Sequence, residues 1–347
     1  MRILVLANNA QGLRSFRLEL IESLVAKGDL WFDVPEGVDD QHVKTLQGAG
    51  AIHLQSKHLG RRGANPLQDA GLLAYYLKTI RKLRPDVVLT YTIKPNVYGG
   101  IACAMSGVPC IANVTGLGTA IEGGGPMQAL TLTLYTLGLR RAQKVFFQNA
   151  SNREFMLSHG VVTGPSDLLP GSGVNTGHFA LSDYPSEGQG TTFLTVGRIM
   201  RDKGTRELIE AACEVKVRHP EVRFVMVGSF DEDLEGIVLH ASEQGIVEYV
   251  ESQPDVRPYY AACHALVHPS YHEGMSNVCL EAASMGRPVI ASDIPGCRET
   301  FDEGITGLGF EPRSADSLVD ALERFIALPH ETRRRMGLAG REKVIRE

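Results

Sequence analysis

Two glutamates, Glu273 and Glu281, lie eight residues apart in the segment HEGMSNVCLEAASMG (272–286). Between them the residues GMSN (274–277) open a predicted helix, whose first backbone amides have no partner within the helix. Carboxylates beside such amides suit the hydroxyls of a sugar or ribose, which both donate and accept hydrogen bonds. Solvation is the simpler explanation, because glutamate is common on exposed helices and acids favour the first helical turn.

Two cations lie close together in the segment GRIMRDKG (197–204). Arg198 follows a predicted strand, and Lys203 precedes the next predicted helix. Two cations and a helix N-terminus at one place suit a diphosphate, which accepts charge-assisted hydrogen bonds. A turn with two solvated cations explains this segment equally well, so the motif alone does not decide.

The acidic segment FDED (230–233) raises the question of a metal. An Asp-x-Asp pair after an apolar strand is how metal-dependent glycosyl transferases hold Mn²⁺ or Mg²⁺, since hard cations prefer oxygen ligands. Capping of the following helix by Asp231 is the preferred interpretation. Arg198 and Lys203 already supply positive charge, so we expect no metal and no cofactor.

The spacing of other residues disfavours two further kinds of site. The segment ANNAQGLRSF (7–16) lacks the GxGxxG spacing of a nicotinamide site. The six cysteines form no CxxC pair. We therefore predict reduced thiols in a cytoplasmic protein, with neither a zinc site nor a disulfide framework.

Short apolar runs alternate with segments of helical periodicity along the whole chain. This pattern predicts parallel sheets that helices cover on both faces. We expect two doubly wound Rossmann-like α/β domains, at 1–175 and 176–347, joined within the Gly- and Ser-rich stretch 169–192. The predicted strands are 2–7, 30–34, 51–54, 86–91, 109–114 and 144–149 in the first domain, and 191–197, 222–228, 246–250, 264–270 and 287–292 in the second.

Open α/β sheets bind ligands beyond the carboxyl ends of their strands. Gly12 and Lys94 follow predicted strands of the first domain, while Gly197, Arg198 and Glu273 follow predicted strands of the second. We therefore expect a ligand-binding cleft to which each domain presents this edge of its sheet.

Charge is distributed unevenly over a chain whose net charge is −5. Residues 1–177 carry 17 Lys and Arg against 12 Asp and Glu, and residues 178–347 carry 18 against 28. The acidic total disfavours a nucleic-acid binder. The basic Lys57–Arg62 loop and the apolar, basic stretch 129–144 suit an anionic membrane surface, although a solvated loop is the better explanation of the first when it is taken alone. No apolar run approaches the roughly 20 residues of a membrane span.

Several segments together resemble family-4 glycosyltransferases of the GT-B fold, over nearly the whole chain. The donor-binding half of that family is matched by VGRIMRDKG (196–204), HPSYHEGMSNVCLEAASMGRPVIASDIPGCRE (268–299) and GLGFEP (307–312). Its bacterial surface-polysaccharide branch, which includes N-acetylgalactosaminyl- and galacturonosyltransferases, is matched by NNAQGLRSFR (8–17), TYTIKPNVYGG (90–100), NVTGLGT (113–119) and VFFQNASNREFM (145–156).

The resemblance implies a retaining, metal-independent transferase that uses a nucleotide sugar, with UDP the expected nucleotide, and a polyprenyl-diphosphate-linked saccharide acceptor. Glu281 is expected to hold the ribose, and Glu273 the transferred sugar. Arg198 and Lys203 are expected to hold the diphosphate, and Gly12 to let a loop approach it. The remaining expected donor-binding residues are Gly197, Gly274, Met275, Ser276 and Asn277.

The chain departs from the family in two places. Lys94 occupies an edge where relatives often carry histidine, so it is a candidate catalytic residue of undefined role. The sequence stops at Glu347 within a helical pattern, and we expect the closing C-terminal helix to be largely absent. A GT-B-fold sugar-nucleotide epimerase and a non-catalytic nucleotide-sugar binder are the alternative functions. The resemblance places the transferase in the cytoplasm, peripheral on the inner face of the plasma membrane.

Overall fold

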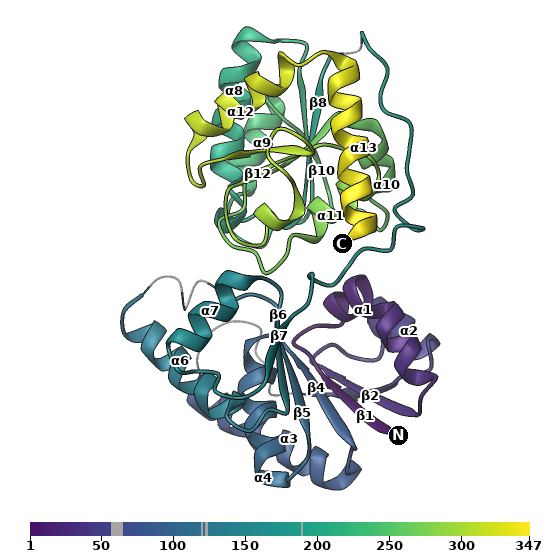
Figure 1. Cartoon of the computed structure of the whole chain (residues 1–347), viewed down its shortest axis with the longest axis vertical. Coiled ribbons are helices and arrows are strands. Elements are labelled where there is room, and N and C mark those ends of the chain that lie inside the picture. Colours follow the sequence, from purple (N-terminus) through teal and green to yellow (C-terminus); the bar gives the residue numbers. More distant parts are fainter. Residues whose placement is uncertain (57–64, 119–120, 122–123, 189) are drawn as a thin grey trace. The chain divides into compact units, whose positions relative to one another are not determined.

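The computed structural model describes residues 1–347 except 57–64, 119–120, 122–123 and 189. The chain divides into two compact units, Met1–Ser172 and Gly173–Glu347. Figure 1 shows the first in purple to teal and the second in teal to yellow.

Unit 1 contains a seven-stranded parallel sheet in the order β3-β2-β1-β4-β5-β6-β7. Its strands are β1 (Arg2–Leu6), β2 (Asp29–Val34), β3 (Ile52–Gln55), β4 (Val87–Tyr91), β5 (Cys110–Val114), β6 (Lys144–Phe147) and β7 (Ser166–Leu168). Its helices are α1 (Ala10–Val25), α2 (Gln41–Gly48), α3 (Pro66–Leu83), α4 (Gly100–Ser106), α6 (Gly125–Leu139) and α7 (Ala150–Ser158), with a π-helical turn η1 (Pro95–Gly99) before α4.

Strand β1 shows why an unbroken apolar run forms a central strand. Ile3 and Val5 pack in one core cluster with residues of α1 and α2. Leu4 and Leu6 face the opposite side and pack with residues of α3 and α4. Successive side chains of a strand point to opposite faces, so a sheet covered on both faces needs apolar residues throughout.

Unit 2 contains a six-stranded parallel sheet in the order β10-β9-β8-β11-β12-β13. Its strands are β8 (Thr192–Val196), β9 (Arg223–Val227), β10 (Glu248–Val250), β11 (Ala265–His268), β12 (Val289–Ser292) and β13 (Gly307–Phe310). Its helices are α8 (Thr205–Arg218), α9 (Glu235–Glu243), α10 (Arg257–Ala262), α11 (Asn277–Ser284), α12 (Ala315–Ile326) and α13 (His330–Arg346), with short 3₁₀ turns η2 (Arg201–Lys203) and η3 (Arg298–Thr300).

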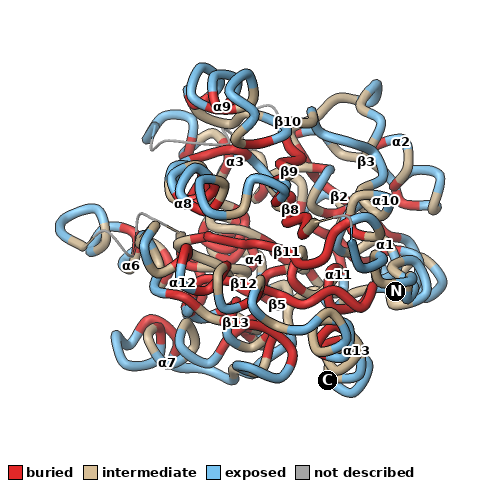
Figure 2. The backbone as a smooth tube through the Cα atoms, turned by 90° about the horizontal axis from the view of Figure 1, so that it is seen from above, coloured by how far each residue is buried: buried red, intermediate tan, exposed pale blue. Residues whose placement is uncertain are grey.

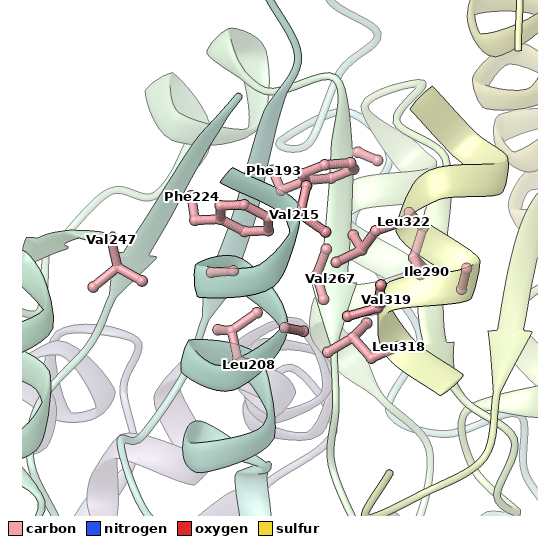
Figure 3. Packing of buried hydrophobic residues seen from close by; sticks show 14 of the residues in the cluster. Phe193, Leu208, Val215, Phe224, Val247, Val267, Ile290, Leu318, Val319 and Leu322 are labelled. Carbon is pink, nitrogen blue, oxygen red and sulfur yellow. The ribbon is translucent and has the colours of Figure 1, made fainter. Parts of the chain in front are cut away.

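Helices cover both faces of the unit 2 sheet as well. On one face, Leu208 of α8 and Leu322 of α12 pack against Phe193 and Val267 of the strands (Figure 3). On the other face, residues of α10 and α11 pack against a second cluster. Figure 2 shows the central strands of the unit 2 sheet, such as β8 and β11, as buried, and much of the helical surface as exposed.

The prediction of two doubly wound α/β domains is confirmed. Two edge strands, β7 and β13, were not predicted as strands. β7 has three residues and is largely exposed, and β13 alternates glycine with apolar residues, so neither has the apolar signal of a buried strand. In each sheet the order reverses beside the first strand, between β1 and β4 and between β8 and β11. Such reversal points are where open sheets bind ligands.

Candidate functional site

The predicted donor residues of unit 2 meet where its strand order reverses. Gly197 and Arg198 directly follow β8, Lys203 ends η2, and Glu273 lies in the loop after the neighbouring strand β11. A pocket at this edge is lined by Gly197, Arg198, Lys203 and His268, among others. Residues up to 76 positions apart in sequence therefore contribute to one site.

Glu273 is held by two neighbouring side chains. Lys203 Nζ forms an ion pair with Glu273 Oε1, and His268 Nε2 lies 2.8 Å from the same oxygen. Lys203 Nζ also donates to Ser270 Oγ at 3.3 Å. Burial by itself raises the pKa of Glu273, but the charge of Lys203 and the hydrogen bond from His268 outweigh it and hold the pKa well below its usual range. Glu273 is therefore an ionised carboxylate that accepts hydrogen bonds at neutral pH.

Arg198 has an acidic partner that the sequence interpretation missed. Its Nη1 lies 2.5 Å from Asp231 Oδ2, and 47% of the Arg198 side chain is exposed. An ion pair this exposed contributes only about 0–1 kcal/mol, so a phosphate that competes for Arg198 displaces Asp231 at little cost.

The expected capping role of Asp231 is wrong. Helix α9 begins at Glu235 with Leu234 as its N-cap, too far along the chain for Asp231 to cap it. Its neighbour Glu232 accepts a hydrogen bond from the Arg201 amide at 2.9 Å. The acidic segment FDED thus holds, through these contacts, the turn that contains Arg198 and Lys203.

The GMSN turn is fixed by the segment after β12. The Ser276 amide donates to Gly296 O at 2.7 Å, so this amide has a partner within the protein. A Cβ on Gly296 would lie 2.6 Å from Gly274 O, which makes glycine necessary for this close approach. Asn277 Oδ1 is buried and, within the described part of the chain, has no hydrogen-bond partner. This oxygen can accept from a ligand.

Glu281 has an environment opposite to that of Glu273. Tyr260 Oη donates to Glu281 Oε2 at 2.9 Å, and no cation of the described residues forms an ion pair with this carboxylate. Burial raises the pKa of Glu281 to about 7, although the hydrogen bond from Tyr260 opposes the rise. A buried carboxylate without a counterion is stabilised when hydroxyl groups donate to it.

Gly12 and Lys94 lie in unit 1. Gly12 is in the first turn of α1, and its amide donates to Asn9 Oδ1 at 2.6 Å, so the expected loop is the start of a helix that Asn9 caps. Lys94 follows β4 and forms an ion pair with Asp69 at 2.8 Å. Its charge is therefore balanced within the protein.

His268 and Tyr260 are site residues that the sequence interpretation did not select. His268 ends strand β11, so a histidine at the carboxyl end of a predicted strand was the available signal. Tyr260 lies 21 positions before Glu281, on a different helix, and its sequence context carries no signal of this contact.

Glycosyl transferase family models match part of each unit. Residues 182–343 match the family model described as "Glycosyl transferases group 1", and residues 38–149 match "Glycosyl transferase 4-like". A Campylobacter jejuni N,N'-diacetylbacillosaminyl-diphospho-undecaprenol alpha-1,3-N-acetylgalactosaminyltransferase is 26% identical, over 98% of this chain and 92% of that protein. The Staphylococcus aureus capsular polysaccharide glycosyltransferase CapM is 28% identical, but over only 43% of this chain and 40% of its own length.

Solved structures show the same fold. Anabaena HepE in complex with UDP and glucose superposes with a TM-score of 0.80 at 16% identity, over 100% of this chain and 95% of that chain. Sucrose-phosphate synthase from Thermosynechococcus elongatus gives 0.79 at 22% identity, over 99% and 94%. The chain therefore carries a group 1 glycosyl transferase domain in residues 182–343 and a glycosyl transferase 4-like domain in residues 38–149, and its two parallel sheets, which reverse beside their first strands, have the GT-B fold.

Proposed function

We propose that this chain is a retaining glycosyltransferase that moves a hexose or N-acetylhexosamine from a UDP-sugar to a polyprenyl-diphosphate-linked saccharide. The observation that carries the proposal is the contrast between two carboxylates at one edge of the unit 2 sheet. Glu273 is ionised beside Lys203, whereas Glu281 is partly buried and forms no ion pair with a cation of the described residues. An ionised carboxylate such as Glu273 suits a sugar on which positive charge develops. A carboxylate without a cation partner, such as Glu281, suits ribose hydroxyls, which can donate hydrogen bonds to it.

The leaving group in this reaction is a nucleoside diphosphate. Arg198 and Lys203 would stabilise the charge that develops on it, which removes the need for a metal ion. Glu273 keeps a low pKa and so does not donate a proton at neutral pH. The acceptor hydroxyl attacks from the side of the leaving group, and the leaving phosphate takes its proton. HepE, solved with UDP and glucose, and the Campylobacter relative, named for its lipid-linked acceptor, support this donor and acceptor class.

A lipid-linked acceptor requires contact with a membrane, and helix α6 offers a surface for it. The fifteen residues of α6 include no charged side chain, and Met127, Leu130 and Leu137 are each about half exposed. The exposed Arg140 and Arg141 follow directly. Apolar side chains beside cations suit peripheral binding to anionic lipid at the inner face of the plasma membrane. The second predicted membrane contact, Lys57–Arg62, lies outside the described residues.

None of the described helices has the length and apolarity that crossing a bilayer requires. Peripheral binding through the apolar side chains of α6 is the mode of membrane contact that we propose.

The proposal is tested in two steps. Thermal unfolding is measured with a panel of nucleotide sugars, and UDP-sugars should give the largest stabilisation. The best donor is then incubated with a short-chain polyprenyl-diphosphate-linked saccharide, and the product's anomeric configuration is read by NMR. Conversion of the donor to its epimer without transfer would indicate an epimerase, and stabilisation without turnover a binding protein. An inverted product would refute the retaining mechanism.

A further inference from the structure

We propose that His268, Cys279 and Cys297 form a binding site for a thiophilic metal ion of the Zn²⁺ class. The three residues come from different elements: the end of β11, helix α11 and the turn before η3. One ligand atom from each lies within 4.8 Å of the other two. His268 is 4% exposed and both cysteines are fully buried, so the cluster is part of the folded interior.

The chemistry of the three groups selects the kind of ion. Thiolates and imidazole bind Zn²⁺ and similar thiophilic ions, whereas Mg²⁺, Ca²⁺ and Mn²⁺ prefer oxygen ligands. Zinc binds sulfur at about 2.3 Å and nitrogen at about 2.0–2.1 Å, which places tetrahedral ligand atoms roughly 3.3–3.8 Å apart. Side-chain shifts of roughly 1 Å would bring this cluster to that spacing. Three protein ligands leave the fourth position open.

His268 connects the cluster to the donor pocket. His268 is one of the residues that line that pocket, so the cluster adjoins it. Its Nε2 also lies 2.8 Å from Glu273 Oε1. When the other ring nitrogen binds a metal, this contact becomes the carboxylate–histidine pair that commonly orients a histidine ligand.

The positions of Cys279 and Cys297 in the sequence give no sign that the two thiols lie close together. Cys279 and Cys297 are 18 positions apart and belong to no CxxC motif, which is why the sequence alone predicted no zinc site. Packing of α11 against the turn after β12 brings the two thiols together.

Occupancy would affect the proposed reaction, a consequence that rests on the proposed function. His268 holds the carboxylate assigned to the donor sugar, so an ion on this histidine changes the position or charge of Glu273. We expect Zn²⁺ to lower the transfer rate and EDTA to restore it.

The site is tested by titrating the reduced chain with Co²⁺, which reports thiolate ligands through a charge-transfer band. The wild type should develop this band with one equivalent of Co²⁺, and Zn²⁺ should remove it. Cys279→Ser and Cys297→Ser should each lose the band. The matched control Cys213→Ser, which alters an exposed cysteine, should keep it. Absence of the band in the wild type, or its persistence in both site variants, overturns the proposal.

A second measurement covers the case in which the site variants fail to fold. In the wild type, Zn²⁺ should slow alkylation of Cys279 and Cys297, mapped by mass spectrometry, and leave that of Cys213 unchanged. Equal alkylation of the two buried thiols with and without Zn²⁺ overturns the site. Because neither readout uses a nucleotide sugar or an acceptor, this result is independent of the proposed transferase activity.

Discussion

Binding of the nucleotide sugar should weaken as pH falls through 7, because Glu281 must be ionised to accept hydrogen bonds from two ribose hydroxyls. An ionised carboxylate only accepts hydrogen bonds, whereas a protonated one uses one oxygen as a donor. Burial raises the pKa of Glu281 to about 7 in the free protein. Hydrogen bonds that the ribose hydroxyls donate stabilise the charged form of Glu281, so its pKa is lower in the complex than in the free protein. Binding at low pH must therefore release a proton.

The magnitude follows from the fraction of ionised Glu281. With a pKa of about 7, this fraction falls from roughly nine-tenths at pH 8 to roughly one-tenth at pH 6. The dissociation constant should therefore rise about tenfold over this interval, which corresponds to about 1.4 kcal/mol. Binding at pH 6 should release about one proton, and binding at pH 8 almost none.

Calorimetric titration with a UDP-sugar measures both quantities when it is repeated in buffers of different ionisation enthalpy. A nucleotide sugar suits the test because its two phosphates are diesters and do not titrate in this interval. Glu281→Gln should bind weakly at every pH and lose the pH dependence. Tyr260→Phe should move the weakening to higher pH, because it removes the hydrogen bond that lowers the pKa of Glu281. An unchanged pH dependence in Glu281→Gln would refute the reasoning.

Four further predictions concern transfer and membrane binding. Arg198→Ala and Lys203→Ala should each lower the transfer rate by about 10²–10³-fold, since each removes a cation from the leaving diphosphate; near-normal turnover in both would exclude that role. Transfer should persist in EDTA, and restoration of a lost activity by Mn²⁺ would instead assign the FDED segment to a metal. Glu273→Gln should lower turnover but leave the affinity for free UDP nearly unchanged, because its carboxylate acts on the sugar; an equal loss of UDP affinity would contradict this. Leu137→Glu should weaken salt-sensitive binding to anionic liposomes, whereas Val217→Glu, an exposed apolar position on α8, should not; equal binding by both variants would exclude α6 as the contact.

The sequence alone determined the class of fold and the edge at which the donor residues lie. Apolar runs such as the one at β1 have apolar side chains on both faces of the strand, and this predicts a parallel sheet that helices cover on both faces. Parallel strands all present their carboxyl ends at one edge, so Arg198, Lys203 and Glu273 were predictable as neighbours from their positions after strands. Two edge strands escaped prediction because short or glycine-rich strands carry little apolar periodicity.

Only the tertiary structure decided the chemical state of the site. Two glutamates that look alike in sequence differ because Glu273 pairs with Lys203, whereas Glu281, among the described residues, accepts a hydrogen bond from a tyrosine hydroxyl and pairs with no cation. Asp231 pairs with Arg198 instead of capping a helix, and the Ser276 amide is used by Gly296. These contacts join residues 20 to 70 positions apart. A pKa or a ligand set depends on burial and on partners brought by packing, which local periodicity and spacing do not encode.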